Sequence, residues 1–322
     1  MNKILSITGP TASGKTALSI ALAHRLHGEI ISCDSMQVYR GLTVGTAAPT
    51  IEEMDGIPHH GIGIVEVTDS FSVADWVTQA DEWILAIADR GKLPILCGGT
   101  GLYLDSLVQI GAFTETDRDD SLRAELAEFA QVHGNEALHQ RLQQIDPEAA
   151  AAIHYNNVKR VIRAIEIFET TGKTKTETDR LQKQNGKRYD EFRVILDFAD
   201  RQVLYDRIDR RVDGMLENGI LEEAKMLWEY KRSHPDTALG TAWQAIGYKE
   251  FFPYFDGDCT LAEAADMVRQ SSRQYAKRQL TWFRGANSNT AGYRLVPDRP
   301  DGSMRSVDEM TEEVLERIQN WM

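Results

Sequence analysis

The amino-acid sequence predicts an α/β protein, in which a parallel sheet is flanked by helices and interrupted by a helical insertion domain. Three observations lead to this prediction. Short apolar segments alternate with helix-like segments in the first third of the chain. A glycine-rich loop follows the first of these segments. Strand signals then disappear between Thr114 and about Gly186, and one returns at Phe192. We therefore expect a core from residues 1–113 and 187–322, with the insertion at 114–186.

The individual elements follow from periodicity and from end signals. A helix over Thr16–Leu26 carries an apolar stripe, and a longer one over Phe71–Arg90 has Ser72 as its cap and ends at Gly91. A third is expected over Leu102–Ile110. Strands are predicted, the third of them weakly, at Lys3–Thr8, Glu29–Cys33, Gly63–Val67, Leu93–Cys97 and Phe192–Asp197.

The insertion and the C-terminal third are predicted to be helical. Insertion helices are expected over Ser121–His133, Asn135–Gln144 and Asn157–Thr171. Beyond Arg201 the chain again has helical periodicity, with turns expected at Gly214, Gly240, Gly257 and Gly285. The segment Asp308–Trp321 is expected to form a terminal amphipathic helix.

Composition excludes several classes of protein. The 322 residues include 42% apolar residues, enough for a core, which argues against a disordered chain. Three separated cysteines, Cys33, Cys97 and Cys259, fit neither a disulfide framework nor a cysteine zinc site. No signal peptide or membrane span is apparent, so we expect a cytoplasmic protein without a membrane partner. The net charge of −13 would by itself argue against nucleic acid as a partner.

A phosphate-binding loop is the most specific local motif. The segment Gly9-Pro10-Thr11-Ala12-Ser13-Gly14-Lys15-Thr16 matches G-x-x-x-x-G-K-[ST] between a predicted strand and a predicted helix. Its glycines let backbone N–H groups surround an anion at the helix N-terminus. Lys15 adds positive charge, and the Thr16 hydroxyl can ligate Mg²⁺. The motif predicts a P-loop NTPase-like fold that binds a nucleotide such as ATP or another di- or triphosphate.

Other motifs of nucleotide hydrolysis are absent or weak. No N-K-x-D guanine-reading motif is present, and Glu66 and Asp69 are weak candidates for a Walker B acid. A stronger carboxylate candidate is Asp34, which directly follows the second strand, where an α/β sheet binds its ligands. There it could accept a proton from a nucleophile. Thr100 has the same topological place, although both residues are also common in ordinary turns.

Positive charge is concentrated in two segments. Residues 159–188 hold nine Lys and Arg against four acids, and residues 267–285 hold five against none, a net charge of +5 in each segment. Arg269, Arg273 and Lys277 share one helix face, which favours a polyanion such as nucleic acid, unless acids elsewhere neutralise them. Among Arg207, Arg210 and Arg211, one side chain could reach the phosphate loop. For His59 and His60 a polar structural role is favoured over a metal site.

These residues together resemble the bacterial tRNA dimethylallyltransferases. The resemblance rests on motifs in order along the chain: GPTASGKT at 9–16, SCDSMQVYRG at 32–41, GTA at 45–47, PHH at 58–60, FSVADW at 71–76, GGTGLY at 98–103, NNVKRVIRAIEI at 156–167, QAIGYKE at 244–250 and AKRQLTWFRG at 276–285. Two departures are Ala48, where the family commonly has Lys, and Gly61-Ile62-Gly63, where it usually reads closer to LID.

The resemblance implies a monomeric enzyme that uses Mg²⁺ to transfer a dimethylallyl group from dimethylallyl diphosphate to N6 of A37 in the tRNA anticodon stem-loop. It implies catalytic roles for Thr11, Lys15, Thr16, Asp34, Thr100 and Arg211. The residues it suggests for RNA binding are Asp34, Ser35, Met36, Gln37, Asn157, Val158, Lys159, Arg160, Val161, Arg163, Lys277, Arg278, Trp282 and Arg284. Two alternatives remain open, a P-loop small-molecule kinase and a non-enzymatic RNA-binding protein.

Overall fold

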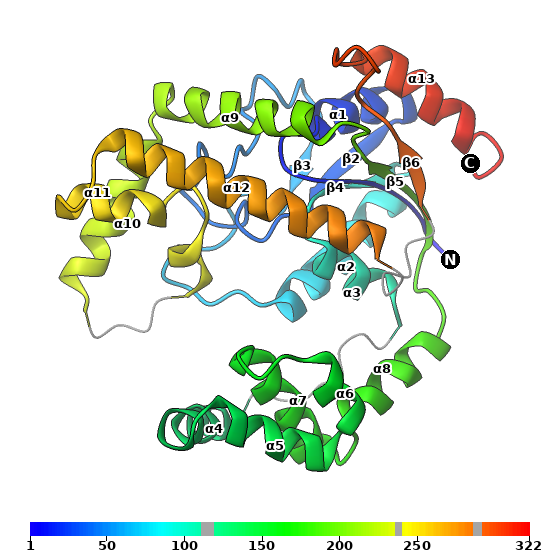
Figure 1. Ribbon diagram of the computed structural model, residues 1–322. Coiled ribbons are helices and arrows are strands. Elements are labelled where there is room, and N and C mark those ends of the chain that lie inside the picture. Colours follow the sequence, from blue (N-terminus) through cyan, green and yellow to red (C-terminus); the bar gives the residue numbers. More distant parts are fainter. Residues whose placement is uncertain (111–118, 236–239, 286–291) are drawn as a thin grey trace. The chain divides into compact units, whose positions relative to one another are not determined.

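The chain forms two compact units in a computed structural model that describes residues 1–110, 119–235, 240–285 and 292–322. The core unit comprises Met1–Leu107 and Tyr189–Met322, and the helical unit comprises Val108–Arg188 (Figure 1). Within the described ranges, no helix combines the length and the hydropathy needed to cross a membrane.

A six-stranded sheet in which every pairing is parallel forms the centre of the core unit. Its order is β3-β2-β4-β1-β5-β6. Parallel neighbours need crossover connections. Helices lie in each connection between consecutive strands except the one from β2 to β3. The strands are β1 (Lys3–Thr8), β2 (Gly28–Ser32), β3 (His59–His60), β4 (Leu93–Gly98), β5 (Asp190–Leu196) and β6 (Tyr293–Leu295). The predicted α/β class is thereby confirmed.

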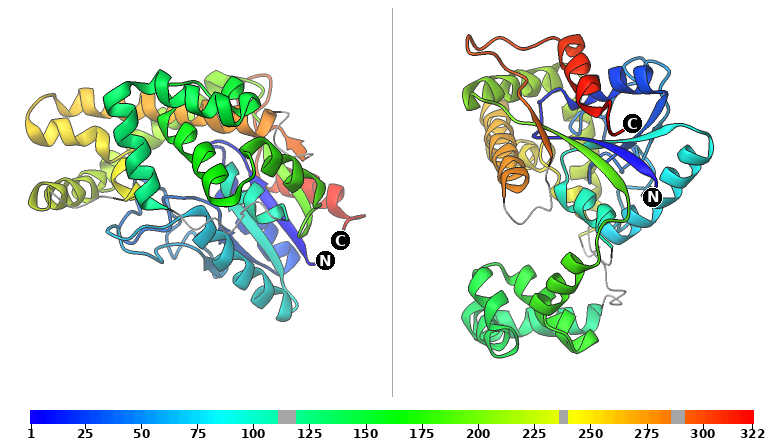
Figure 2. Two further views of the ribbon diagram at one scale, coloured as in Figure 1. Left: turned by 90° about the horizontal axis from the view of Figure 1, so that it is seen from below. Right: turned by 90° about the vertical axis from the view of Figure 1, so that its right-hand side faces the viewer.

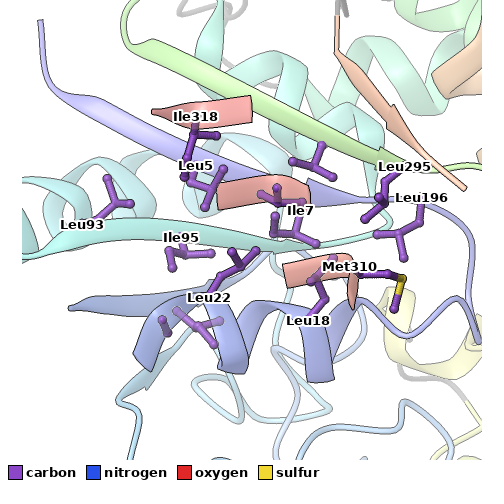
Figure 3. Packing of buried hydrophobic residues seen from close by; sticks show 14 residues of the cluster. Leu5, Ile7, Leu18, Leu22, Leu93, Ile95, Leu196, Leu295, Met310 and Ile318 are labelled. Atoms are coloured by element: carbon purple, nitrogen blue, oxygen red, sulfur yellow. The ribbon is translucent and has the colours of Figure 1, made fainter. Parts of the chain in front are cut away.

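Helices cover the sheet because alternate strand residues point to opposite faces. On one face, α1 (Lys15–Leu26) packs beside α13 (Val307–Ile318), as Figure 2 also shows. Their side chains Leu18, Leu22, Met310 and Ile318 contact sheet residues that include Leu5, Ile7, Ile95 and Leu196 (Figure 3). Helix α2 (Val73–Asp89) packs against β2 and β4, where the indole of Trp76 donates to the carbonyl of Ser32.

Apart from α3, the remaining helices of the core unit lie between β5 and β6 in the sequence. Figure 1 shows α9 and α12 side by side, and their side chains form a small apolar cluster that includes Ile208 and Ala276. The bounds are α3 (Gly101–Val108), α9 (Arg201–Glu217), α10 (Ile220–Ser233), α11 (Phe252–Asp256) and α12 (Leu261–Arg284), with short 3₁₀ turns at Thr241–Gln244 and Lys249–Phe251.

The helical unit has its own core. Its two ends meet where the Arg188 N–H donates to the carbonyl of Val108. Apolar side chains such as Leu126, Leu142 and Ile165 pack in its interior. The buried carboxylate of Glu166 binds the guanidinium groups of Arg123 and Arg163. The helices are α4 (Asp120–His133), α5 (Asn135–Ile145), α6 (Pro147–Ala152), α7 (Val158–Thr171) and α8 (Lys175–Gln184).

Three sequence-based predictions of elements were wrong or incomplete. The third strand is His59–His60 and not Gly63–Val67, because Gly61 and Gly63 adopt positive φ and Val65 makes only an isolated bridge with Tyr39. Gly214 forms no turn and lies inside α9, since a helix tolerates a single glycine. The strand β6 was not predicted, because three residues are too few to give a periodic signal.

Candidate functional site

A cavity of about 310 Å³ opens at the carboxyl ends of the central strands. Its walls come from the phosphate loop, the segment after β2, the end of β4, residues 244–249, and the helices α9 and α12. Ligands of open α/β sheets bind at this edge, because loops and helix N-termini converge there. Within the described part of the chain, Asp34 is the only carboxylate that lines the cavity.

The phosphate loop closes around the N-terminus of α1. Gly14 precedes α1 with φ of 92°, and no side chain caps the free N–H groups of the first turn. Gly9 has φ of 144°, and a Cβ there would lie 2.8 Å from the carbonyl oxygen of Leu196. The sequence needs glycine at both places, and the exposed N–H groups suit an anion.

Lys15 brings positive charge to this loop. Its ammonium donates to the carbonyl of Pro10 at 2.6 Å. Withdrawal of the ammonium from water lowers the pKa of Lys15 to about 8, and the nearby cation of Arg211 acts in the same direction. An anion bound in the loop would restore the charged form, because opposite charges favour ionisation.

Two arginines of α9 reach the phosphate loop, as the sequence suggested one could. Arg211 Nη1 donates to Thr11 Oγ1 at 2.9 Å, and Arg207 Nε donates to the carbonyl of Ala12 at 2.8 Å. Burial lowers the pKa of Arg211, while the negative charge of Asp34 acts in the opposite direction. The loop therefore has one cation of its own, Lys15, and two that reach it from α9.

Asp34 and Thr100 belong to one hydrogen-bonded group. Asp34 Oδ1 accepts from the Met36 N–H at 2.9 Å, and Thr100 Oγ1 accepts from the Ser35 N–H at 3.2 Å. Tyr275 of α12 lines the same cavity. Burial raises the pKa of Tyr275, and the negative charge of Asp34 raises it further, so its hydroxyl stays protonated. Thr100 thus holds the backbone next to Asp34 and is not among the residues lining the cavity.

The cavity lining combines apolar and charged side chains. Ile208, Val212 and Met215 of α9 and Val268 of α12 are apolar. Lys15 and Arg211 carry positive charge, and Thr16 adds a hydroxyl group. Such a lining suits a ligand that joins a phosphate group to a short apolar chain.

A second loop of the wall was not expected from the sequence. The carboxylate of Glu223 on α10 accepts from the N–H groups of Thr43 and Val44 and from the hydroxyl of Tyr248. These bonds fix the segment that contains Gly45, Thr46 and Ala47, and these three residues line the cavity. Tyr248 belongs to the motif QAIGYKE, but no local pattern marks Glu223, because its partners lie far away in sequence.

The expectation for the basic face of α12 was wrong for two of its three residues. Arg269 pairs with Asp213 and Asp266, and Arg273 pairs with Asp209. The acids of α9 neutralise this face, which therefore needs no polyanion.

Other basic residues near the end of α12 differ in their surroundings. Arg284 pairs with Asp197, a carboxylate that it shares with Arg294. Arg278 lines the cavity and lies over the ring of Tyr275, 5.6 Å from its centroid. Lys277 is exposed. The Trp282 indole donates to Asp105, and 38% of Trp282 stays exposed.

Lys249, outside α12, is a further exposed cation of the cavity lining, like Arg278. The sequence did not indicate it as a site residue.

The RNA-binding residues expected in the helical unit divide into two groups. Asn157, Lys159 and Arg160 are exposed at the start of α7, and Val158 is partly exposed beside them. Val161 is fully buried in the core of this unit, so its expected contact with RNA is wrong. Arg163 donates to Glu166 and is only partly exposed.

Each histidine of the pair has a polar partner on one ring nitrogen. His59 Nδ1 bonds to the carbonyl of Ile57, and His60 Nε2 bonds to Glu29. Burial alone would raise the pKa of Glu29, but hydrogen bonds from His60, Lys92 and Arg90 outweigh it and lower that pKa to about 2. Over the described ranges, no three His, Cys, Asp or Glu side chains form a metal-binding cluster.

Known proteins resemble this chain along most of its length. A family model described as IPP transferase matches residues 37–286, and one described as isopentenyl transferase matches residues 2–62. A tRNA dimethylallyltransferase of Halalkalibacterium halodurans is 51% identical over 88% of each chain. One of Bacillus mycoides is 46% identical over 98% of this chain and 94% of its own.

Solved structures agree with these relatives. The full-length tRNA isopentenylpyrophosphate transferase of Bacillus halodurans is 44% identical and covers 99% of this chain and 98% of its own, with a TM-score of 0.67. A eukaryotic dimethylallyltransferase acting on tRNA is 33% identical, with a TM-score of 0.80 over 92% of this chain and 74% of its own.

Proposed function

This chain belongs to the IPP transferase family, and we propose that it transfers a dimethylallyl group from dimethylallyl diphosphate to N6 of A37 in the tRNA anticodon loop. The products are N6-(dimethylallyl)adenosine and diphosphate. The observation that carries the proposal is the cavity itself. It combines a phosphate loop and apolar wall residues with Asp34, the one carboxylate that lines it among the described residues. We also propose that the enzyme is a monomer and that it acts on tRNA in the cytoplasm.

The main effect of the site is to lower the activation barrier for departure of the diphosphate. The adenine amine is a weak nucleophile, because its lone pair is delocalised into the ring. As the donor C–O bond breaks, the bonding electrons leave with the diphosphate. Lys15, Arg211 and the free N–H groups of the loop are positioned to stabilise that negative charge.

A magnesium ion fits the residue types beside the phosphate loop. Thr16 lines the cavity together with Lys15. Its hydroxyl is the kind of oxygen ligand that Mg²⁺ takes together with phosphate oxygens and water. When bound, the ion would add positive charge at the diphosphate. Thr16 is the residue that would hold it.

Asp34 would orient the amine and take its proton. Asp34 Oδ1 is engaged by the Met36 N–H, while no hydrogen bond to Oδ2 is found within the described part of the chain. Oδ2 is therefore the oxygen that would accept the N6 proton as the new N–C bond forms. Ser35, Met36 and Gln37 continue the same wall and would contact the base.

The target base must leave its stack to reach Asp34, at a cost of a few kcal/mol. Contacts to RNA phosphates would offset that cost. In the core unit, Lys249, Arg278 and Lys277 are exposed cations suited to this role. In the helical unit, Lys159 and Arg160 are exposed cations on α7.

Mass spectrometry tests the proposal directly. An unmodified anticodon stem-loop with adenosine at position 37 is incubated with the protein, Mg²⁺ and dimethylallyl diphosphate, and a parallel tube contains ATP in place of the donor. We expect one added five-carbon group in the donor tube only. No added mass on folded, RNA-binding protein would refute prenyl transfer and favour the small-molecule kinase, which shares the loop and Asp34.

A further inference from the structure

We propose that Gln279 is a positioning residue of the reaction, which locks the phosphate loop to the turn after β4 and thereby sets the place of Thr11. This inference rests on the proposed function, since its readout is transfer of the dimethylallyl group. Gln279 lies on α12, is only 5% exposed and lines the cavity.

The side-chain amide of Gln279 makes two hydrogen bonds of opposite sense. Its Oε1 accepts from the Thr11 N–H at 2.8 Å, and its Nε2 donates to the carbonyl of Gly99 at 3.1 Å. A backbone N–H only donates and a carbonyl only accepts, so these partners fix the orientation of the amide. One side chain thus connects the loop after β1 with the turn after β4.

Gln279 leaves no space for a side chain at Gly99. A Cβ at Gly99 would lie 2.1 Å from Gln279 Nε2 and 3.1 Å from the carbonyl oxygen of Gly9. No larger residue fits there while Gln279 holds its place. The motifs GPTASGKT, GGTGLY and AKRQLTWFRG therefore meet at a single amide, although they lie far apart in the sequence.

The consequence falls on Thr11. Its N–H is occupied by Gln279 and is therefore not available to an anion in the loop. Its hydroxyl instead accepts from Arg211 Nη1. By fixing the backbone of Thr11, Gln279 holds this hydroxyl and Arg211 where the charge on the departing diphosphate develops. If Thr11 and Arg211 were displaced, the transition state would lose more stabilisation than the bound donor would.

Steady-state kinetics of Gln279→Ala test this role, with Gln274→Ala as the control. Gln274 has the same side chain on the same helix and is exposed. We expect Gln279→Ala to lower kcat about 10- to 100-fold, since two buried bonds are lost, and to leave the donor KM within about threefold. In a Thr11→Ala background the same change should cost less than about threefold, because both residues act as one unit.

Two further variants keep the test decisive where Gln279→Ala folds poorly. Gly99→Ala should lower kcat about as much as Gln279→Ala, and the double variant should be no worse than either, because removing the amide makes room for the methyl group. Gln279→Glu should gain activity as pH falls, because a protonated carboxyl can donate to Gly99 and a carboxylate cannot.

Three results would overturn the inference. The first is a kcat of Gln279→Ala within twofold of the kcat of Gln274→Ala. The second is a double variant, with Thr11→Ala or Gly99→Ala, whose loss of kcat equals the product of the two single losses. The third is a Gln279→Glu variant whose pH profile matches that of the unaltered protein. A protein that is inactive with dimethylallyl diphosphate before any substitution would instead refute the proposed function.

Discussion

At the scale of single residues, the site depends on a carboxylate placed among cations. Asp34 lines the cavity together with Lys15 and Arg211, and its charge opposes the loss of a proton from either cation. Neither cation has a carboxylate partner among the ion pairs of the described residues. Their charge is therefore left for a bound diphosphate, and the carboxylate is left for the nucleophile.

The first prediction concerns Asp34. Asp34→Asn keeps an oxygen that can accept from the Met36 N–H, so the loop should keep its conformation. It removes the base, so we expect kcat to fall by about 10²- to 10⁴-fold, with tRNA affinity changed less than about twofold. Single-turnover kinetics and a binding titration measure the two effects. Asp55→Asn, at an exposed residue paired with His24, is the control; an equal loss in both variants would argue against a catalytic base.

The second prediction is a pH dependence from Lys15. Burial lowers the pKa of the Lys15 ammonium to about 8 in the free protein, so its charge is present below that pH and lost above it. The donor must bind the charged form. We expect log kcat/KM for the donor to be level below about pH 8 and to fall with a slope near −1 above it.

The matched variant for that profile is Lys15→Arg, whose guanidinium stays charged throughout this range. It should remove the inflection even if its activity is lower. A profile of the unaltered protein that is level from pH 7 to 9.5 would show that Lys15 does not control donor binding.

At the scale of elements, the packing of α9 against α12 builds one wall of the cavity. Leu204 and Ile208 of α9 meet Ala276 and Leu280 of α12 in a shared apolar cluster. Ion pairs of Arg269 and Arg273 with Asp213 and Asp209 lie along the same contact. The basic stripe of α12 is thus explained by α9, and it contributes to alignment of Arg211 and Gln279 on the two helices.

The third prediction separates this structural role from RNA binding. Both partners of the Arg273–Asp209 pair are about a third exposed, so Arg273→Gln should lower the free energy of unfolding by only about 1 kcal/mol. We expect Tm to fall by about 2–4 °C and RNA affinity to stay constant. Combining Arg273→Asp with Asp209→Arg should recover part of the loss. Thermal unfolding measures this, and a large loss of RNA affinity in Arg273→Gln would contradict it.

At the scale of the whole molecule, charge is segregated. The net charge is −13, yet exposed cations remain on α7 of the helical unit and at the end of α12 in the core unit. Phosphate contacts release counterions, so binding of an RNA responds to these local cations and not to the average charge. An acidic isoelectric point is therefore compatible with an RNA substrate.

The fourth prediction follows from that segregation. The affinity for an anticodon stem-loop should fall steeply with salt concentration. Lys159→Gln and Lys277→Gln should each reduce the slope of log K against log salt by about 1. Arg269→Gln is the control, because that arginine is paired with Asp213 and Asp266. Salt titrations measure the slopes; a flat dependence in the unaltered protein would rule out phosphate binding by these residues.

The local sequence was sufficient to predict those parts of the protein that are built from contiguous residues. The strand, loop and helix around Gly9–Thr16 follow from spacing and glycine geometry, and they lie where the sequence predicted them. Asp34 lines the cavity because it follows a strand of a parallel sheet, which is a property of topology that the alternation of elements already indicates. The motifs in order along the chain also indicated the family, which the relatives confirm.

Only the tertiary structure decided which distant residues meet. Arg211 and Thr11 are 200 positions apart, Gln279 and Thr11 are 268 apart, and Arg273 and Asp209 are 64 apart. Such contacts depend on how helices pack against the sheet, and no periodicity within one segment records the partner of another. For the same reason the sequence could show an unbalanced basic helix face but not the acids that balance it.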